Sequence, residues 1–376
     1  MWWNKFFLVS VIFYSGAAFA QRLEIPDSLR QRVFVAGYHS GFIFAHSIHV
    51  QNTKGTKPDG FELEYSHLRT DSASRAHYSC YPRSGFNFTY TDFNKQLLGQ
   101  SYSLCYFIEP NYRIGNWLHV NVRAAAGLSY MTNPFDSVKN PENQSYSWPI
   151  NTLLQLGFGV VCPLTKHFAL YGRGNFFHNS NGGFQEPNAG VNYINASVGL
   201  QYFAYSNQLP VYRKARDTAW RKQPVHIDVS AFYSPKGGFR PDSVAQRKFV
   251  AGACVQVVKR VGNIDAIMAG AEIYYDDGLH TIKKVFIQDE SSSTMAGILL
   301  GHQFLINRFT FSQELGIYIY KRTDRYNELY ADLFHTVYHR WGLSYQVRKH
   351  WFVGVNLLAH NQIADFIDGR LTYRIK

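Results

Sequence analysis

Three polar residues around one chain reversal, His178, Ser180 and Asn192, are of the types that hydrolyse esters. A serine hydroxyl becomes a good nucleophile only when a base takes its proton, and a third group must hold that base. This set therefore indicates acyl transfer, with Ser180 as nucleophile, His178 as base and Asn192 as the orienting group. Asn181, next to the serine, could donate to the oxyanion. The alternative interpretation is that these are ordinary polar residues where a strand meets a loop, with no catalytic role.

The residues on both sides of this reversal alternate between apolar and polar, which is the period-2 signal of β-strands. Pairing His178 with Asn192 also places Phe176 opposite Ile194, so that the two apolar faces match. A slip of one residue would break these matches. The pattern predicts a hairpin with His178, Ser180 and Asn192 on its apolar face, at the loop end.

The first twenty residues read as a signal peptide rather than as part of the fold. Lys5 gives a positive start, residues 6–14 form an apolar core, and Ala18-Phe19-Ala20 is a small-x-small cleavage site. The mature chain is expected to begin near Gln21. In a bacterium such a signal leads to the periplasm or the outer membrane.

Aromatic content and strand patterning define the expected fold class. No run reaches the ~18 uninterrupted apolar residues of a membrane helix. Yet 16% of the residues are aromatic, with 26 Tyr and 29 Phe, and short alternating segments recur along the chain. These features predict an all-β protein, an antiparallel transmembrane β-barrel of the outer membrane. A soluble secreted β-sandwich is the alternative.

The strand signals fall into two sets of eight. The first set lies within residues 21–206, a polar linker covers 207–224, and the second set lies within 225–376. Two arrangements fit this pattern: the second set closes a separate barrel, or it merges with the first into one sheet of sixteen strands. Long and short turns alternate, which places the Ser180 loop on the external side. Residues 69–84 are too long for a periplasmic turn and have no explanation in the sequence.

The chain is basic, with 38 Lys and Arg against 26 Asp and Glu and a formal charge of +12. A basic barrel rim would suit the phosphates of lipopolysaccharide in the outer leaflet. No nucleic-acid motif occurs, and export also argues against a nucleic-acid partner.

The four cysteines include no CxxC pair and no Cys/His cluster with zinc spacing, so neither a metal nor another cofactor is expected. Export permits a Cys80–Cys105 disulfide. The simpler interpretation is that these are small apolar side chains.

The two halves share a faint pattern. Lys166-His167-Phe168 leads to His178, and Lys349-His350-Trp351 leads to His360. The offset differs by one residue, which places His360 on the opposite face of its strand. We therefore expect His360 to be a hydrogen-bonded residue of the barrel interior. Gln362 stands where the second half would need its serine.

The hairpin motif resembles that of the outer-membrane lipid A 3-O-deacylase (PagL) family, also called acyloxyacyl hydrolases. The resemblance rests on His178-x-Ser180-Asn181-x-Gly183, Pro187-Asn188-x-Gly190 and the outward position of Asn192, and it covers roughly residues 30–206. It implies an eight-stranded barrel that removes an ester-linked acyl chain from lipid A. It further implies that His178 is the base, that Ser180 is the nucleophile and that Asn181 helps to form the oxyanion hole. It implies no metal.

Asn192 departs from the family pattern, because the best-known member has a glutamate there. An amide can orient an imidazole, but it cannot stabilise an imidazolium as a carboxylate does. Either the activity is lower or another acid serves, and Glu186 in the loop is the alternative acid. The rival hypothesis is a non-catalytic barrel, a channel or a structural protein, with a decayed site.

Overall fold

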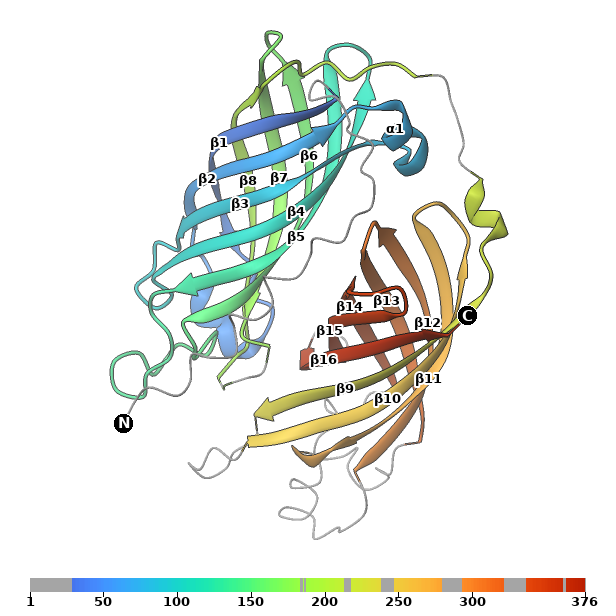
Figure 1. Cartoon of the computed structure of the whole chain (residues 1–376). Coiled ribbons are helices and arrows are strands. Elements are labelled where there is room, and N and C mark those ends of the chain that lie inside the picture. Colours follow the sequence, from blue (N-terminus) through green and yellow to red (C-terminus); the bar gives the residue numbers. More distant parts are fainter. Residues whose placement is uncertain are drawn as a thin grey trace, which may run out of the picture.

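In a computed structural model, the chain forms two closed antiparallel barrels of eight strands each, blue to green and yellow to red in Figure 1. The structure describes residues 29–182, 185, 187–212, 218–237, 247–278, 293–320, 336–360 and 363–375. The predicted signal peptide therefore lies outside the described residues. β1 pairs with β8 and β16 pairs with β9, so each half closes on itself. The single sheet of sixteen strands is excluded.

All sixteen predicted strands are confirmed, although most extend further than the sequence pattern indicated. The first barrel consists of β1 (Arg30–Ile43), β2 (Asp59–Arg69), β3 (Tyr81–Asp92), β4 (Gln100–Ile114), β5 (Leu118–Met131), β6 (Ile150–Pro163), β7 (Phe168–Ser180) and β8 (Val191–Phe203). The second consists of β9 (His226–Gly237), β10 (Arg247–Arg260), β11 (Asp265–Asp276), β12 (Thr294–Ile306), β13 (Phe309–Tyr320), β14 (Val337–Gln346), β15 (Trp351–His360) and β16 (Ile363–Ile375).

Both barrels are apolar outside and polar inside. In β7 the outward residues Phe168, Leu170 and Phe176 are exposed, while Arg173 and Asn175 are buried. This is the reverse of a water-soluble barrel, because lipid takes the place of water on the outer face. Helices with both ends among the described residues are α1 (Ser72–Tyr78), η1 (Ile48–Thr53) and η2 (Ala219–Lys222). None of them has the length and apolar character to cross a membrane.

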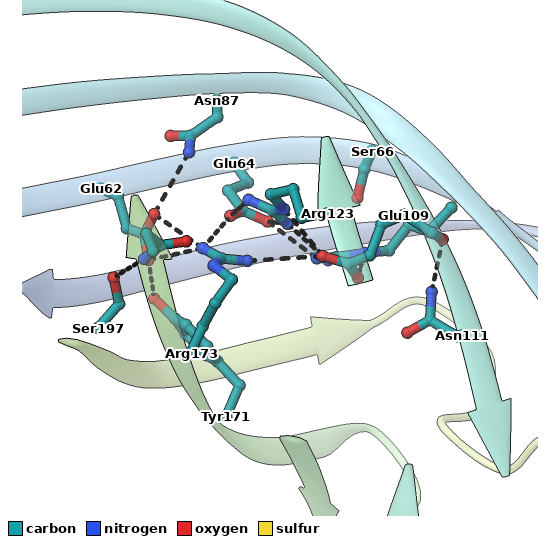
Figure 2. Close-up of polar contacts among 12 residues, drawn as sticks. Glu62, Glu64, Ser66, Asn87, Glu109, Asn111, Arg123, Tyr171, Arg173 and Ser197 are labelled. Carbon is teal, nitrogen blue, oxygen red and sulfur yellow. Dashed lines mark hydrogen bonds and ion pairs between the residues drawn. The ribbon is translucent and has the colours of Figure 1, made fainter. Parts of the chain in front are cut away.

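A balanced set of buried charges fills the interior of the first barrel (Figure 2). Arg123 donates to Glu109 Oε2 through Nη2 at 2.6 Å and to Glu64 Oε2 at 3.0 Å. Its guanidinium also lies 3.8 Å from the ring centre of Phe107. Six ion-pairing residues form this cluster, namely Glu62, Glu64, Glu109, Arg83, Arg123 and Arg173. The three negative and three positive groups leave no net charge to be compensated in the lumen.

The segment between β2 and β3 contains α1, which explains the length of residues 69–84. Asp71 caps the helix, because its carboxylate accepts a hydrogen bond from the Ser74 N–H at 2.7 Å. Cys80 follows the helix and, like Cys105, is a buried free thiol, so the permitted disulfide is not formed. Burial raises the pKa of the Cys80 thiol to about 12, which keeps it protonated and unreactive.

His360 lies inside the second barrel, as predicted. Its side chain is buried, and its Nε2 atom is 3.1 Å from the Tyr318 hydroxyl. Tyr318 in turn contacts the Tyr274 hydroxyl at 2.5 Å. Residues 361 and 362, where a serine equivalent would be sought, lie outside the described residues.

The start of the predicted linker packs back onto the short-turn end of the first barrel. Leu209 is only 4% exposed and joins an apolar cluster with Val33, Leu68 and Tyr81. The Tyr212 hydroxyl donates to the Thr70 carbonyl at 2.7 Å. Residues 206–212 therefore cover this end of the barrel.

This covering segment predicts the smallest unit that folds well. We expect a 21–212 fragment to refold in detergent with a β-rich circular dichroism spectrum and protease resistance, because its barrel closes without the second half. A 21–206 fragment should unfold at lower urea concentration, since losing the buried Leu209 side chain costs about 1.5–3 kcal/mol. If neither fragment folded without residues 225–376, the barrels would not be independent units.

Candidate active site

The hairpin of β7 and β8 has the register that the sequence predicts. His178 pairs with Asn192, and Phe176 pairs with Ile194. The loop that follows Ser180 lies at the same end of the barrel as the long β1–β2 and β5–β6 connections, residues 44–58 and 132–149. The candidate residues therefore lie where the barrel wall meets the long loops of this end.

A hydrogen bond joins His178 to Asn192 across the two strands. The His178 Nδ1 atom lies 2.5 Å from Asn192 Oδ1. Because an amide oxygen only accepts, Nδ1 carries the proton and donates it. The other ring nitrogen, Nε2, is then unprotonated and is the atom able to act as a base.

Ser180 lies at the end of β7, where the strand pairs with Thr152 of β6. Ser180 is only 8% exposed, whereas Phe176, an outward residue further down the strand, is 39% exposed. The loop therefore covers Ser180. Its Oγ atom accepts a hydrogen bond from the Gly182 N–H at 3.3 Å. Within the described part of the chain, no hydrogen bond joins Ser180 to His178. Such bonds often form only once the substrate is bound.

Asn181 ties the loop together. Its N–H donates to Asn188 Oδ1 at 2.9 Å, and its Nδ2 donates to the Gln185 carbonyl at 2.7 Å. The Ser147 hydroxyl donates to the same Gln185 carbonyl, also at 2.7 Å. The loop is therefore anchored to the β5–β6 connection on one side and to its own second half on the other.

Gly190 has no replacement without strain. Its φ of +79° lies in the left-handed region, and a Cβ atom would stand 3.0 Å from His178 Cε1. Its N–H donates to the Ser145 carbonyl at 2.8 Å. The motif glycine thus lets the loop backbone pass against the imidazole of His178.

His46 is a site residue that sequence reasoning missed. It follows β1, and its Nδ1 atom lies 3.0 Å from Asn192 Nδ2. Its Nε2 atom lies 3.1 Å from the carbonyl oxygen of Ala189. Nothing in the local pattern near His46 predicts this contact, because the contact depends on closure of the barrel between β1 and β8.

Glu186, the alternative acid, lies outside the described residues, as does Gly183 of the motif. In the parts of the chain that are described, no group of three or more His, Cys, Asp or Glu side chains could hold a metal ion.

Apolar side chains surround the site on the outer surface of the barrel. Leu154 on β6 pairs with His178, and Phe42 on β1 pairs with Ile194. Leu154, Phe176, Ile194, Phe42 and Phe44 are all exposed. The site thus lies above a lipid-facing apolar surface, and its own polar groups mark the upper edge of that surface.

An apolar outer face and a polar interior in closed antiparallel barrels define an outer-membrane β-barrel protein. The profile of the lipid A 3-O-deacylase (PagL) family matches residues 59–201, and that of the acyloxyacyl hydrolase C-terminal domain matches residues 225–376. Together these matches cover well over half of the chain. The chain belongs to the lipid A 3-O-deacylase (PagL) family, and it is a protein of the bacterial outer membrane.

Solved barrel structures are similar at low identity. Neisserial surface protein A is 12% identical, with a TM-score of 0.31, and the match covers 46% of this chain and 96% of that one. The translocator domain of the autotransporter NalP from Neisseria meningitidis is 9% identical, with a TM-score of 0.23, covering 92% and 88%. No curated protein matches the chain at a significant level.

Proposed function

We propose that this protein is a serine esterase that removes an ester-linked acyl chain from lipid A, with Ser180 as nucleophile and His178 as base. The observation that carries the proposal is the hydrogen bond from His178 Nδ1 to Asn192 Oδ1. His178 lies two residues before Ser180 on the same strand, at the lipid-facing edge of the barrel. Membership of a deacylase family supports the same reaction class.

The reaction follows from the proton positions. His178 Nε2 takes the Ser180 proton as Oγ attacks the ester carbonyl, and it returns that proton to the departing sugar hydroxyl. The acyl group then sits on Oγ, and water attacks it with His178 again acting as base. The free fatty acid is released and the serine is restored.

We assign the stabilisation of the oxyanion to two groups. The Gly182 N–H already points at Ser180 Oγ, from 3.3 Å away. Asn181 stays the predicted side-chain donor, although its amide donates to the Gln185 carbonyl when no substrate is present. Breaking that bond would free one N–H for the oxyanion, where a single donor contributes about 10²–10³-fold to kcat.

The surroundings suit a lipid substrate with a charged head group. Acyl chains could lie along the exposed apolar row of Leu154, Phe176 and Ile194. Exposed lysines stand in the loops above, namely Lys54, Lys57 and Lys139. Cations at that level would attract the phosphates of lipid A.

The interior of the first barrel speaks against a channel there. The ion pairs of the interior cluster, which include those of Arg173 and Arg83, have almost fully buried side chains. Packed interiors of this kind are typical of eight-stranded barrels, which lack an open pore.

The direct test compares lipid A from cells that express the protein with lipid A from cells that do not. Mass spectrometry should show loss of one acyl chain only when the protein is present, together with release of the matching fatty acid. Unchanged lipid A with correctly folded protein in the outer membrane would leave the non-catalytic barrel as the better explanation.

The variant Asn192→Glu tests the departure from the family pattern. A carboxylate stabilises the imidazolium formed in the transition state, so kcat should rise if Asn192 occupies the orienting position. Glu186→Gln should then have little effect on kcat. The opposite pair of results, no change with Asn192→Glu and a severe loss with Glu186→Gln, would assign the acid to Glu186.

A further inference from the structure

A chain of hydrogen bonds links His178 through Asn192 to a second histidine, His46. The contact between His46 and the Ala189 carbonyl determines which atoms in this chain donate and which accept. The Ala189 carbonyl oxygen can only accept a hydrogen bond, so His46 Nε2 must carry a proton to contact it at 3.1 Å. In a neutral imidazole the other nitrogen, Nδ1, is then an acceptor. It accepts from Asn192 Nδ2 at 3.0 Å.

This order determines which way the Asn192 amide points. With Nδ2 directed at His46, Oδ1 is left to face His178 Nδ1 at 2.5 Å. A flipped amide would place its donors against His178 and its oxygen against the lone pair of His46. The two ends of the amide differ, so the amide must be turned the right way, whereas a carboxylate at this position would present an acceptor oxygen to His178 in either orientation.

The Ala189 carbonyl is itself held in place by the neighbouring loop. The Ala189 N–H donates to the Gln144 carbonyl at 3.0 Å, and the Gly190 N–H donates to the Ser145 carbonyl at 2.8 Å. The peptide that anchors His46 is therefore fixed on both sides by the β5–β6 connection.

We propose that His46 is a positioning residue, which orients Asn192 so that His178 keeps its proton on Nδ1 and its lone pair on Nε2. His46 thereby supplies the directionality that an acid would give directly. The proposal rests on the proposed esterase function, and it explains how a neutral amide can serve in this site.

The test measures kcat and KM for fatty-acid release from purified lipopolysaccharide by the full chain in detergent. His46→Ala should lower kcat by about 10–10²-fold, as for other residues that orient a functional group, with KM nearly unchanged. His49→Ala is the matched control, because His49 is exposed on η1 three positions away, and it should behave as the native protein. In an Asn192→Asp background the same His46→Ala change should cost less than about threefold, because a carboxylate needs no orientation. Equal losses in both backgrounds, or no loss in either, would overturn the proposal.

Nitrogen-15 NMR of histidine-labelled protein tests the same proposal independently of catalysis, because it reports which ring nitrogen of His178 carries the proton. His178 should be the Nδ1–H tautomer in the native chain and a mixture in His46→Ala. An unchanged His178 tautomer in the folded variant would refute the role of His46. If native protein released no fatty acid while the tautomer still depended on His46, the esterase function would fail and the positioning role would stand.

Discussion

Ser180→Ala is expected to abolish release of fatty acid from lipid A, and His178→Ala is expected to do the same. The members of such a site act as a unit, and loss of either one typically lowers kcat by about 10⁴–10⁶-fold. His178 Nε2 has no other role in the described structure, and its Nδ1 atom is already engaged by Asn192. The measurement is fatty-acid release from purified lipopolysaccharide, with each variant refolded in detergent.

Folding must be shown to be intact for this result to count. Ser180 and His178 stand at the end of β7, apart from the buried ion pairs, and each side chain makes one hydrogen bond to a described residue, so each variant should lower the free energy of unfolding by no more than about 1–3 kcal/mol. Ser40→Ala, an exposed serine on β1, is the matched control and should retain full activity. Full activity of folded Ser180→Ala would end the hypothesis of a serine nucleophile.

Arg123→Met is expected to destabilise the first barrel by about 3–5 kcal/mol, because it leaves a buried negative charge without compensation. Arg123 is fully buried and joins Glu64 and Glu109, two of the three carboxylates of the interior cluster (Figure 2). With Arg123 gone, two arginines would face three carboxylates. The measurement is the urea midpoint of the variant in detergent, followed by circular dichroism and gel mobility.

Two further variants separate charge balance from lost packing. Arg32→Met removes an exposed arginine of the same barrel and should leave the midpoint nearly unchanged. The double variant Arg123→Met with Glu109→Gln restores neutrality and should recover part of the lost stability. If it were no more stable than Arg123→Met alone, the loss would come from packing against Phe107 rather than from charge.

Much of the fold could be read from the sequence, because strand alternation is a local signal. In β7 and β8, apolar residues recur at every second position, which identifies the outward face of each strand. Matching the two outward faces gave the pairing of His178 with Asn192. The strand ends were less predictable. β3 begins at Tyr81, inside the 69–84 segment that the sequence did not explain, and the short capped helix α1 before it gives little periodic signal.

The sequence by itself determined the local parts of this protein: the strands, the hairpin register and the placing of His178 and Asn192 on one face. Only the tertiary structure decided how these parts close. Two separate barrels rather than one sheet, the packing of Leu209 under the first barrel, and the balance of three carboxylates by three arginines all depend on contacts between distant strands. His46 belongs to the same group. It reaches Asn192 only because β1 closes the barrel against β8, and no local pattern records which strands will be neighbours after closure.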